Sequence, residues 1–268
     1  MDLNYVHPLV IMFMRCNALK DIIDRFNFIN LDETDSTNNF LKRNVETLPD
    51  LTVVTAELQT AGRGRMGKSF CSPKGTGAYF SILLKNDISV EISKHLTVMT
   101  AVAVLEEIQT VTDGDVKIKW VNDVYIDGKK VCGILTEGSV NPQSENLNYA
   151  IIGIGINLKI SENGFPKDLV DKVTCVFENE CSKSQKENLI KGIICRIYKM
   201  ITGEDAHYID RYRKYSYLDG KKISIINGNS TESATALYID ENCNLVANKD
   251  ETGETVTLFS GDVSIKPV

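Results

Sequence analysis

Residues 62–69 read Gly62-Arg63-Gly64-Arg65-Met66-Gly67-Lys68-Ser69 and match the phosphate-loop pattern G-x-x-x-x-G-K-[ST] letter for letter. A phosphate loop leads directly into a helix, because free N–H groups at the helix amino terminus hold the phosphates. Here the helix breakers Pro73, Gly75 and Gly77 follow instead. We therefore exclude a P-loop NTPase and predict a mobile glycine-rich loop, carrying two arginines between two strands, that closes over an anionic ligand.

Composition narrows the class of protein without naming a function. The chain has 268 residues, of which 43% are hydrophobic and 25% charged, as in a soluble protein with one large and one small domain. A net charge of −6 argues against a general nucleic-acid binder. Seven cysteines without a C-x-x-C pair favour neither zinc nor a disulfide framework, so we expect a reducing cytoplasm. The apolar run Leu9–Met14 is too short to span a membrane.

Hydrophobic patterning predicts a mixed α/β region followed by a small all-β module. Strands are expected at 26–31, 51–58, 78–85, 116–120, 124–126, 131–135 and 149–157, and helices at 92–111 and over most of 164–215. Asp127-Gly128 predicts a tight hairpin turn, because both residues tolerate positive φ. Short alternating strands at 223–226, 236–239, 244–247, 255–259 and 263–265 predict a small β-barrel.

Three polar groups stand at strand ends or connections, where α/β folds usually place their sites. They are Ser36-Thr37-Asn38, Gln59 through Gly67, and Lys119 with Asn122, Asp123 and Lys130. An organic carboxylate and a nucleoside triphosphate repel each other, so bringing them together requires cations, which Arg63, Arg65, Lys119 and Lys130 could supply. Asp123 and Asn157 are candidate oxygen ligands for magnesium. An acyl-adenylate product hydrolyses easily, which gives a water-excluding loop a purpose.

Each group also has a plainer interpretation. Ser36 stands where a helix cap belongs, ahead of residues 37–43, so its hydroxyl could satisfy an amide of the first turn. Arg63 and Arg65 alone are compatible with a solvated loop, Lys119 with a half-exposed strand, and Lys129-Lys130 with a charged turn. The three histidines have no companions at metal or catalytic spacing, so we treat them as non-catalytic.

Taken together, five motifs in order resemble the motif series of biotin protein ligases. They are Ser36-Thr37-Asn38, residues 56–67 (Ala-Glu-Leu-Gln-Thr-Ala-Gly-Arg-Gly-Arg-Met-Gly), residues 119–123 (Lys-Trp-Val-Asn-Asp), residues 130–135 (Lys-Val-Cys-Gly-Ile-Leu) and residues 153–157 (Gly-Ile-Gly-Ile-Asn). The resemblance runs from about residue 26 to 160, and the tail at 260–266 looks like the family's small C-terminal barrel.

The resemblance implies a fold and an activity. The fold is an α+β, mixed α/β catalytic domain like that of class II aminoacyl-tRNA synthetases, with an SH3-like β-barrel behind it. We expect an N-terminal extension at 1–25, the catalytic domain at 26–217 and the barrel at 218–268. Family members join biotin to ATP, giving biotinyl-5'-AMP, and then biotinylate one lysine of the biotin carboxyl carrier domain of a carboxylase.

Roles carry over motif by motif as expectations. Biotin is expected at Ser36, Thr37, Asn38, Gln59, Arg63, Gly64, Arg65, Lys130 and Gly133, with Gly153 and Gly155 completing the pocket wall. ATP is expected at Arg63, Arg65, Phe70, Lys119, Asn122 and Asn157, and Mg²⁺ at Asp123 and Asn157. The expected catalytic residues are Lys130, which touches the biotin carboxylate and the α-phosphate, Arg65, and Asp123, which orients the carrier lysine.

The chain departs from the family pattern in a few places. Phe70 stands for the usual Trp and keeps an aromatic ring with less area, and Val121 stands for the usual Pro, where only strand stiffness is expected to change. No winged-helix repressor domain precedes the motifs, so we expect a monofunctional ligase that binds neither DNA nor a membrane; a homodimer stays open. Two rivals remain: a lipoate-type protein ligase on the same fold, and a non-enzymatic interaction module built on the barrel.

Overall fold

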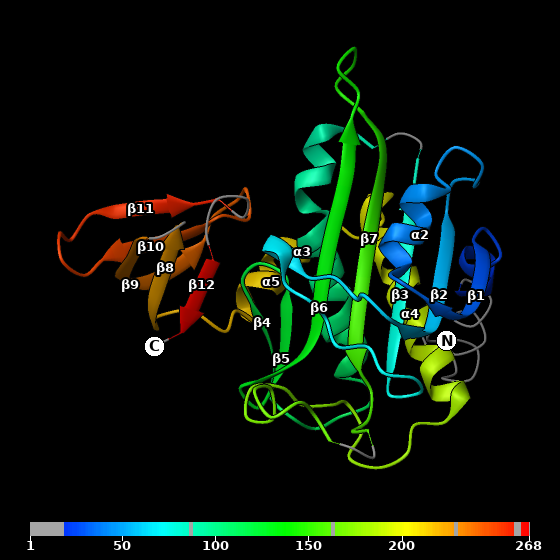
Figure 1. Ribbon diagram of the computed structural model, residues 1–268. Coiled ribbons are helices and arrows are strands. Elements are labelled where there is room, and N and C mark those ends of the chain that lie inside the picture. The colour runs from blue at the N-terminus through cyan, green and yellow to red at the C-terminus, as the bar shows by residue number, and fades with distance from the viewer. Residues whose placement is uncertain (1–18, 86–87, 162–163, 228–229, 260–263, 268) are drawn as a thin grey trace, which may run out of the picture.

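A seven-stranded mixed sheet forms the larger part of the molecule (Figure 1). The computed structural model describes residues 19–85, 88–161, 164–227, 230–259 and 264–267. The strands lie in the order β1 (Asn27–Thr34), β2 (Thr52–Gln59), β3 (Gly77–Leu84), β7 (Leu147–Asn157), β6 (Lys129–Val140), β5 (Asp123–Ile126) and β4 (Val116–Lys119). Only β1 and β2 pair in parallel within this sheet.

Helices cover the two faces of this sheet unequally. The long helices α3 (Val90–Ile108) and α4 (Lys183–Ile201) pack together on one face, where α3 contacts β4 to β7 (Figure 1). The short helix α5 (Tyr208–Lys214) packs against α3. On the opposite face, α2 (Thr37–Arg43) contacts β2, β3 and β7. On the face that carries α2, the surface over β5 and β6 is therefore available for a site.

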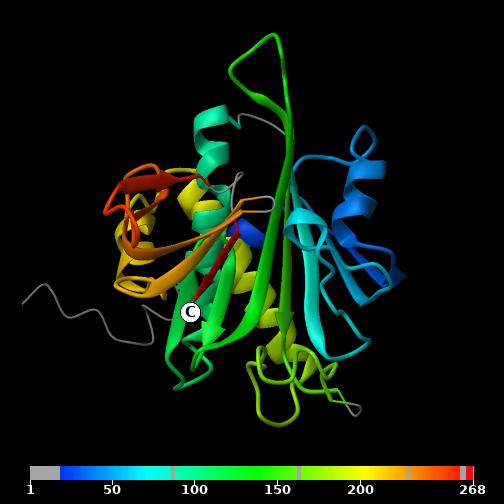
Figure 2. The same ribbon diagram turned by 60° about the vertical axis from the view of Figure 1, so that its left-hand side comes forward.

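The small second sheet lies beside the end of the large one that carries β4. Its strand order is β11 (Thr255–Leu258), β10 (Leu245–Lys249), β9 (Ser230–Ile239), β8 (Lys222–Asn227) and β12 (Ser264–Pro267). Hydrogen bonds tie it to the rest of the molecule: among them, Trp120 Nε1 donates to the Cys243 carbonyl at 2.9 Å, and Arg213 Nε donates to the Ile239 carbonyl at 2.8 Å. Both views show the two sheets side by side, with the β6–β7 hairpin extending beyond them (Figure 2).

Most elements follow the pattern of the sequence. The strands of both sheets and α3 fall where they are predicted, and the β5–β6 turn has positive φ at Asp127 (49°) and Gly128 (78°). Residues 1–18 and 260–263, which include parts of the expected extension and barrel, lie outside the described residues. In the described ranges no helix is both long and apolar enough to cross a bilayer.

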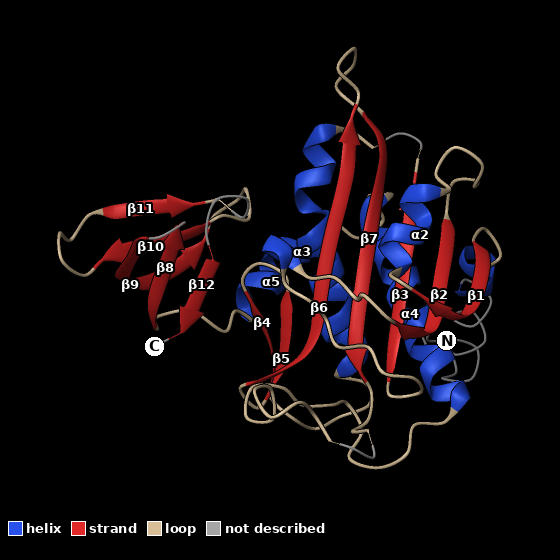
Figure 3. Cartoon of the chain, in the orientation of Figure 1, coloured by secondary structure: helices blue, strands red, loops and turns tan. Residues whose placement is uncertain are grey.

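Two expectations about local structure are wrong. The region from 164 to 182 is loop, not helix, as Figure 3 shows, because Pro166 initiates turns there and the helix starts only after Ser182, whose hydroxyl caps α4. Val121 does not lie in a strand. It belongs to the turn between β4 and β5, and the peptide bond from Trp120 to Val121 is cis.

Candidate active site

One row of residues crosses five strands of the large sheet and forms the floor of the site. Tyr79 in β3 pairs with Gly155 in β7, Gly155 with Gly133 in β6, Gly133 with Asp123 in β5, and Asp123 with Lys119 in β4. Residues directly opposite each other in a sheet point to the same face. Segments more than seventy residues apart in sequence therefore converge on one surface.

The ring of Phe70 lies over the two glycines in this row. A Cβ atom at Gly155 would come within 2.6 Å of Phe70 Cε1, and one at Gly133 within 3.3 Å of Phe70 Cε2. Phe70 also meets Tyr79 edge-on, with 6.5 Å between the ring centroids, and burial raises the pKa of Tyr79 to about 12. Glycine is required at these strand positions so that an aromatic ring can approach the backbone.

Next to Phe70 lies a first hollow, which we call the glycine pocket. It is lined by Ser36, Thr37, Asn38, Gln59, Arg63, Phe70, Gly133, Leu135, Gly153, Ile154 and Gly155. Ser36 occupies the cap position of α2, but its side chain makes no capping hydrogen bond. Instead, Gln59 Oε1 accepts from the backbone N of Thr37 at 2.9 Å and from Thr37 Oγ1 at 3.2 Å. Ser36 therefore occupies the expected N-cap position, but the expected hydrogen bond of its hydroxyl is not formed, and Gln59 supplies an acceptor for the first turn.

Asn38 is held in a fixed orientation at the wall of the glycine pocket. Its Nδ2 donates to the Leu135 carbonyl at 3.2 Å and to Glu137 Oε2 at 2.9 Å, while its Oδ1 accepts from Ser81 Oγ at 2.6 Å. A Cβ atom at Gly153 would overlap the Asn38 amide. Asn38 can therefore form this wall only because residue 153 is a glycine, which has no side chain.

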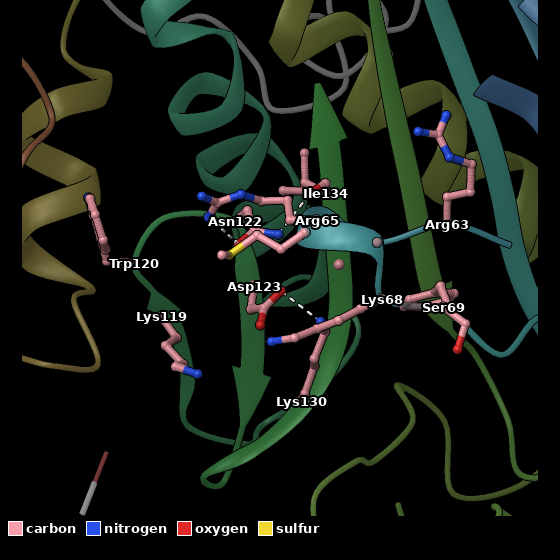
Figure 4. A pocket seen from close by; sticks show the side chains of 14 residues that line it. Arg63, Arg65, Lys68, Ser69, Lys119, Trp120, Asn122, Asp123, Lys130 and Ile134 are labelled. Atoms are coloured by element: carbon pink, nitrogen blue, oxygen red, sulfur yellow. Dashed lines mark hydrogen bonds and ion pairs between the residues drawn. The ribbon is translucent and has the colours of Figure 1, made fainter. Parts of the chain in front are cut away.

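A second hollow, which we call the cationic pocket, has a volume of about 240 Å³. It is lined by Arg63, Gly64, Arg65, Met66, Lys68, Ser69, Phe70, Lys119, Trp120, Asn122, Asp123, Lys130, Gly133 and Ile134. Figure 4 shows Lys130 and Asp123 side by side, with 2.7 Å between Lys130 Nζ and Asp123 Oδ1. Lys119 lies near them in the same view. Several cations from separate chain segments therefore meet in one pocket.

The arginine loop, residues 62–70, is folded as a small hairpin over both pockets. Gly64 N donates to the Lys68 carbonyl at 2.6 Å and Phe70 N to the Gly62 carbonyl at 2.8 Å. The turn at 65–67 has positive φ at Met66 (54°) and Gly67 (73°), and the chain after Ser69 is extended rather than helical. The exclusion of a phosphate loop is confirmed.

The two arginines of this loop point to different sides. Arg65 Nη1 donates to Asn122 Oδ1 at 3.2 Å. Burial lowers the pKa of Arg65, and the negative charge of Asp123 opposes that shift. Arg63 Nη1 donates to Asn39 Oδ1 at 3.0 Å and to Glu137 Oε2 at 2.9 Å, and Figure 4 shows its side chain directed away from Lys119 and Lys130. The structure thus brings Arg65, but not the guanidinium of Arg63, to the remaining cationic groups.

A third hollow, the apolar pocket, lies on the other side of Lys130 and measures about 120 Å³. Its walls include Phe70, Pro73, Phe165, Leu169 and Val173, with Lys130, Lys159 and Asn157 at polar positions. The side chain of Asn157 donates to the Thr174 carbonyl at 3.1 Å. The loop 164–176, expected to be helical, forms one wall of this pocket.

Asp123 and Asn157 do not come together as a metal site. Asp123 lines the cationic pocket and pairs with Lys130, whereas Asn157 lines the apolar pocket and donates its amide to the backbone. Across the described residues no group of three or more His, Cys, Asp or Glu side chains could hold an ion. The donor set therefore does not fit a magnesium ion held jointly by these two residues.

Comparison with known proteins assigns the family. A family model described as the biotin/lipoate A/B protein ligase family matches residues 31–157. The bifunctional ligase/repressor BirA of Bacillus subtilis is 32% identical over 240 residues, which cover 88% of this chain and 72% of that protein. The chain belongs to the biotin protein ligase family. The resemblance inferred from the five motifs is confirmed.

Other members of the biotin protein ligase family agree over most of the chain. The biotin–[acetyl-CoA-carboxylase] ligase of Mycobacterium tuberculosis is 26% identical over 238 residues, covering 86% of each chain. The biotin protein ligase from Aquifex aeolicus, solved in complex with biotin and ATP, superposes with a TM-score of 0.74 at 24% identity, covering 90% of this chain and 99% of that one. That likeness supports the fold, a mixed α/β ligase domain with a small second sheet.

Sequence reasoning missed Glu137, which joins Arg63 to Asn38. A signal for it exists, because Gly133, Leu135 and Glu137 alternate along β6 and therefore face the same side of the sheet. Continuing this alternation by two residues beyond Leu135 predicts that the carboxylate of Glu137 lies beside the glycine pocket. Glu137 lies outside the five motifs that carry the family resemblance.

Proposed function

We propose that this chain activates biotin with ATP to biotinyl-5'-AMP and transfers the biotinyl group to a lysine of a carrier domain of a biotin-dependent carboxylase. The observation that carries the proposal is the convergence of three pockets. Phe70 lines all of them, and Lys130 lines the cationic and apolar pockets. A Cβ atom added to Gly133, at the edge of the glycine pocket, would lie 3.2 Å from Lys130 Nζ. One ammonium group can thus reach reactants in each pocket.

The glycine pocket suits the fused rings of biotin. It offers an apolar floor at Gly153 and Gly155 and polar side chains at Ser36, Asn38 and Gln59 around the rim. Biotin carries one ureido group on its ring system, so a small number of fixed donors and acceptors at this pocket matches that group. The valeryl chain would run past Gly133, which places its carboxylate beside Lys130.

ATP is proposed to span the other two pockets. The triphosphate is polyanionic and suits the cationic pocket, where Arg65, Lys119 and Lys130 lie. The adenine is flat and apolar and suits the apolar pocket between Phe70 and Leu169. Lys130 lies between these two hollows, which is where the α-phosphate would meet the biotin carboxylate.

The chemistry then follows from charge and position. A carboxylate oxygen of biotin attacks the α-phosphorus, the bond from that phosphorus to the β-phosphate oxygen breaks, and pyrophosphate leaves. Lys130 offsets the repulsion of the two anions and the charge that develops on the α-phosphate, a contribution of about 3 kcal/mol or more for a preorganised donor in a partly closed site. Arg65 would stabilise the same charge from the loop.

Transfer uses the same pocket. The amine of the carrier lysine attacks the acyl carbon, the bond to the AMP oxygen breaks, and AMP leaves with its electron pair. Asp123 would orient the incoming lysine and accept its proton, because its carboxylate is released from Lys130 when Lys130 turns to the phosphate. Asp123 and Asn157 line different pockets and do not fit a magnesium ion held jointly, so the steps above assign neither residue to the metal.

Partner and compartment belong to the same proposal. A carboxylase carrier domain is the acceptor, since relatives are named as acetyl-CoA-carboxylase ligases. DNA binding is not included, because a net charge of −6 does not favour contact with phosphates. A reducing cytoplasm is supported by the free thiols of the described cysteines, of which Cys132, Cys195 and Cys243 are buried. Homodimer formation stays open.

The test measures both half-reactions. Purified protein with ATP, magnesium and biotin should release pyrophosphate only when biotin is present, and addition of a carrier domain should give a biotinylated lysine detectable by mass. A carrier in which that lysine is replaced by arginine should stay unlabelled while pyrophosphate is still released. Absence of biotin-dependent pyrophosphate release would favour the non-enzymatic interaction module. Lipoate is not favoured, because the relatives are biotin ligases.

A further inference from the structure

Glu137 lies where the arginine loop, α2 and the sheet meet. It lies in the last third of β6, where it pairs with Ile151 of β7, and Ile151 in turn pairs with Leu83 of β3. Leu83 and Ile151 belong to the small apolar core beneath α2, together with Leu41 and Val54. The backbone of Glu137 is therefore fixed by two neighbouring rigid elements, whereas the arginine loop is a surface hairpin.

The carboxylate of Glu137 is shared between two donors. Its Oε2 accepts from Arg63 Nη1 at 2.9 Å and from Asn38 Nδ2 at 2.9 Å. The side chains of Arg63 and Glu137 are 38% and 22% exposed, so the ion pair is partly shielded from water. A single oxygen thus connects the loop to the wall of the glycine pocket.

Neighbouring contacts strengthen this connection on both sides. Beyond Asn38, hydrogen bonds continue through Ser81 and Thr37 to Gln59, all of which face the glycine pocket or its base. Beyond Arg63, Asn39 accepts from the guanidinium at 3.0 Å. The closed position of the loop and the orientation of the pocket wall are therefore set by one hydrogen-bonded group.

We propose that Glu137 is a positioning residue that latches the arginine loop closed through Arg63 and couples this closure to the orientation of Asn38. The latch keeps the Arg63 side of the loop at the glycine pocket, which leaves Arg65 to enter the cationic pocket. It explains why two arginines separated by one glycine point in different directions. The inference rests on the proposed function, in which the loop retains an activated acid.

The strength of the ion pair between Arg63 and Glu137 predicts how much more often the loop opens when the pair is removed. A partly exposed ion pair contributes about 1 kcal/mol or less, which corresponds to roughly fivefold in an opening equilibrium. Glu137→Gln keeps the shape and an acceptor for Asn38 but removes the charge. It should raise the rate at which trypsin cuts after Arg65 in the loop by roughly threefold to fivefold, and the leakage of activated biotin by a similar factor. The KM for biotin should change less than these two quantities.

A double-mutant cycle separates the latch from a general loss of stability. Arg63→Gln removes the same pair from the exposed side, so it should reproduce the effect of Glu137→Gln, and the double variant should be no worse than either single variant. Glu145→Gln, an exposed carboxylate beside the same β6–β7 hairpin, should behave like the unchanged protein. If Glu137→Gln lowers the melting temperature strongly, Arg63→Gln still tests the pair.

The outcomes are decisive in either direction. Increased cutting at Arg65 in both single variants without additivity supports the latch, while unchanged cutting in both, or effects that add, overturns it. Because proteolysis needs no substrate, it reports on the latch even if biotin turns out not to be the activated acid. Failure of biotin activation with intact coupling would therefore count against the proposed function and not against the latch.

Discussion

Lys130 and Asp123 form an ion pair across neighbouring strands, with 2.7 Å between Lys130 Nζ and Asp123 Oδ1. Their side chains are 28% and 17% exposed, so the pair is open to the cationic pocket. An ion pair that borders solvent can exchange partners at modest cost. Lys130 can therefore turn from Asp123 to an anionic reactant, and Asp123 then becomes an acceptor for another cation.

Replacing Lys130 by alanine is expected to abolish activation while preserving the fold. The cation facing two anions has no apolar substitute, so biotin-dependent pyrophosphate release should fall by about a hundredfold or more. The free energy of unfolding should fall by about 1–3 kcal/mol, because the mostly buried Asp123 carboxylate loses its partner. Lys129→Ala, at the exposed first residue of β6, is the control. Unchanged pyrophosphate release in Lys130→Ala removes this lysine from the mechanism.

Replacing Arg65 by glycine is expected to release the activated acid into solution. Arg65 is the loop cation that reaches Asn122 beside Asp123, so its loss removes the contact that draws the loop to the cationic pocket. Bystander proteins mixed with the variant, ATP and biotin should acquire biotin on their lysines, as measured by streptavidin blotting. Lys74→Ala, in a nearby exposed turn, should label none. Unlabelled bystanders with the Arg65 variant contradict closure by the loop.

Gly153→Ala is expected to damage the glycine pocket selectively. A Cβ atom there overlaps the Asn38 amide, and overpacking of this kind typically costs about 1–3 kcal/mol. The KM for biotin should rise roughly tenfold or more, whereas the KM for ATP should change little. Gly138→Ala on β6, where an added Cβ meets Leu147 Cδ1 and the Tyr149 carbonyl oxygen at 3.2 Å but lines none of the three pockets, is the control for crowding within the strand. Equal increases in both KM values would place biotin elsewhere.

Asp35 is expected to make stability dependent on pH in acid. The guanidinium of Arg43 holds the pKa of Asp35 well below its ordinary value, so the unfolded chain binds the proton more readily than the folded one. The stabilisation is complete above the ordinary pKa of about 4 and is lost as the pH falls toward the folded value. The free-energy difference between the protein and Asp35→Asn should be about 1 kcal/mol or less at neutral pH, because the pair is exposed.

The measurement for Asp35 is urea unfolding of both proteins at several pH values. The difference between them should shrink as the pH drops below about 4. A difference that stays constant down to the lowest pH would show that the carboxylate is not stabilised by Arg43 in the folded state.

Local patterns in the sequence predicted much of the fold. Alternation along the strands and the Asp127-Gly128 turn identify β5, β6 and β7, and the order of polar motifs anticipates the convergence of Lys119, Asp123 and Lys130. These features depend on short-range rules, namely side-chain period and turn chemistry. The sequence alone therefore predicts which segments of the chain lie next to one another at the site.

Features set by tertiary contacts could not be predicted in the same way. The segment 164–182 carries apolar residues, but its shape follows from packing against Lys130 and the end of β7 rather than from helical periodicity. The divergence of Arg63 and Arg65 depends on Glu137, which is distant in sequence. The acceptor for the Thr37 amide likewise comes from Gln59, which is distant in sequence, and not from the hydroxyl of the N-cap residue Ser36.

The central claim is that the three pockets bring biotin and ATP together at Lys130. The most direct measurement incubates the protein with ATP, magnesium and equal amounts of radiolabelled biotin and lipoate, and then identifies which acid forms a mixed anhydride with AMP. Biotinyl-AMP should form and lipoyl-AMP should be absent or much slower. Formation of lipoyl-AMP in preference, or of neither anhydride, would contradict the account.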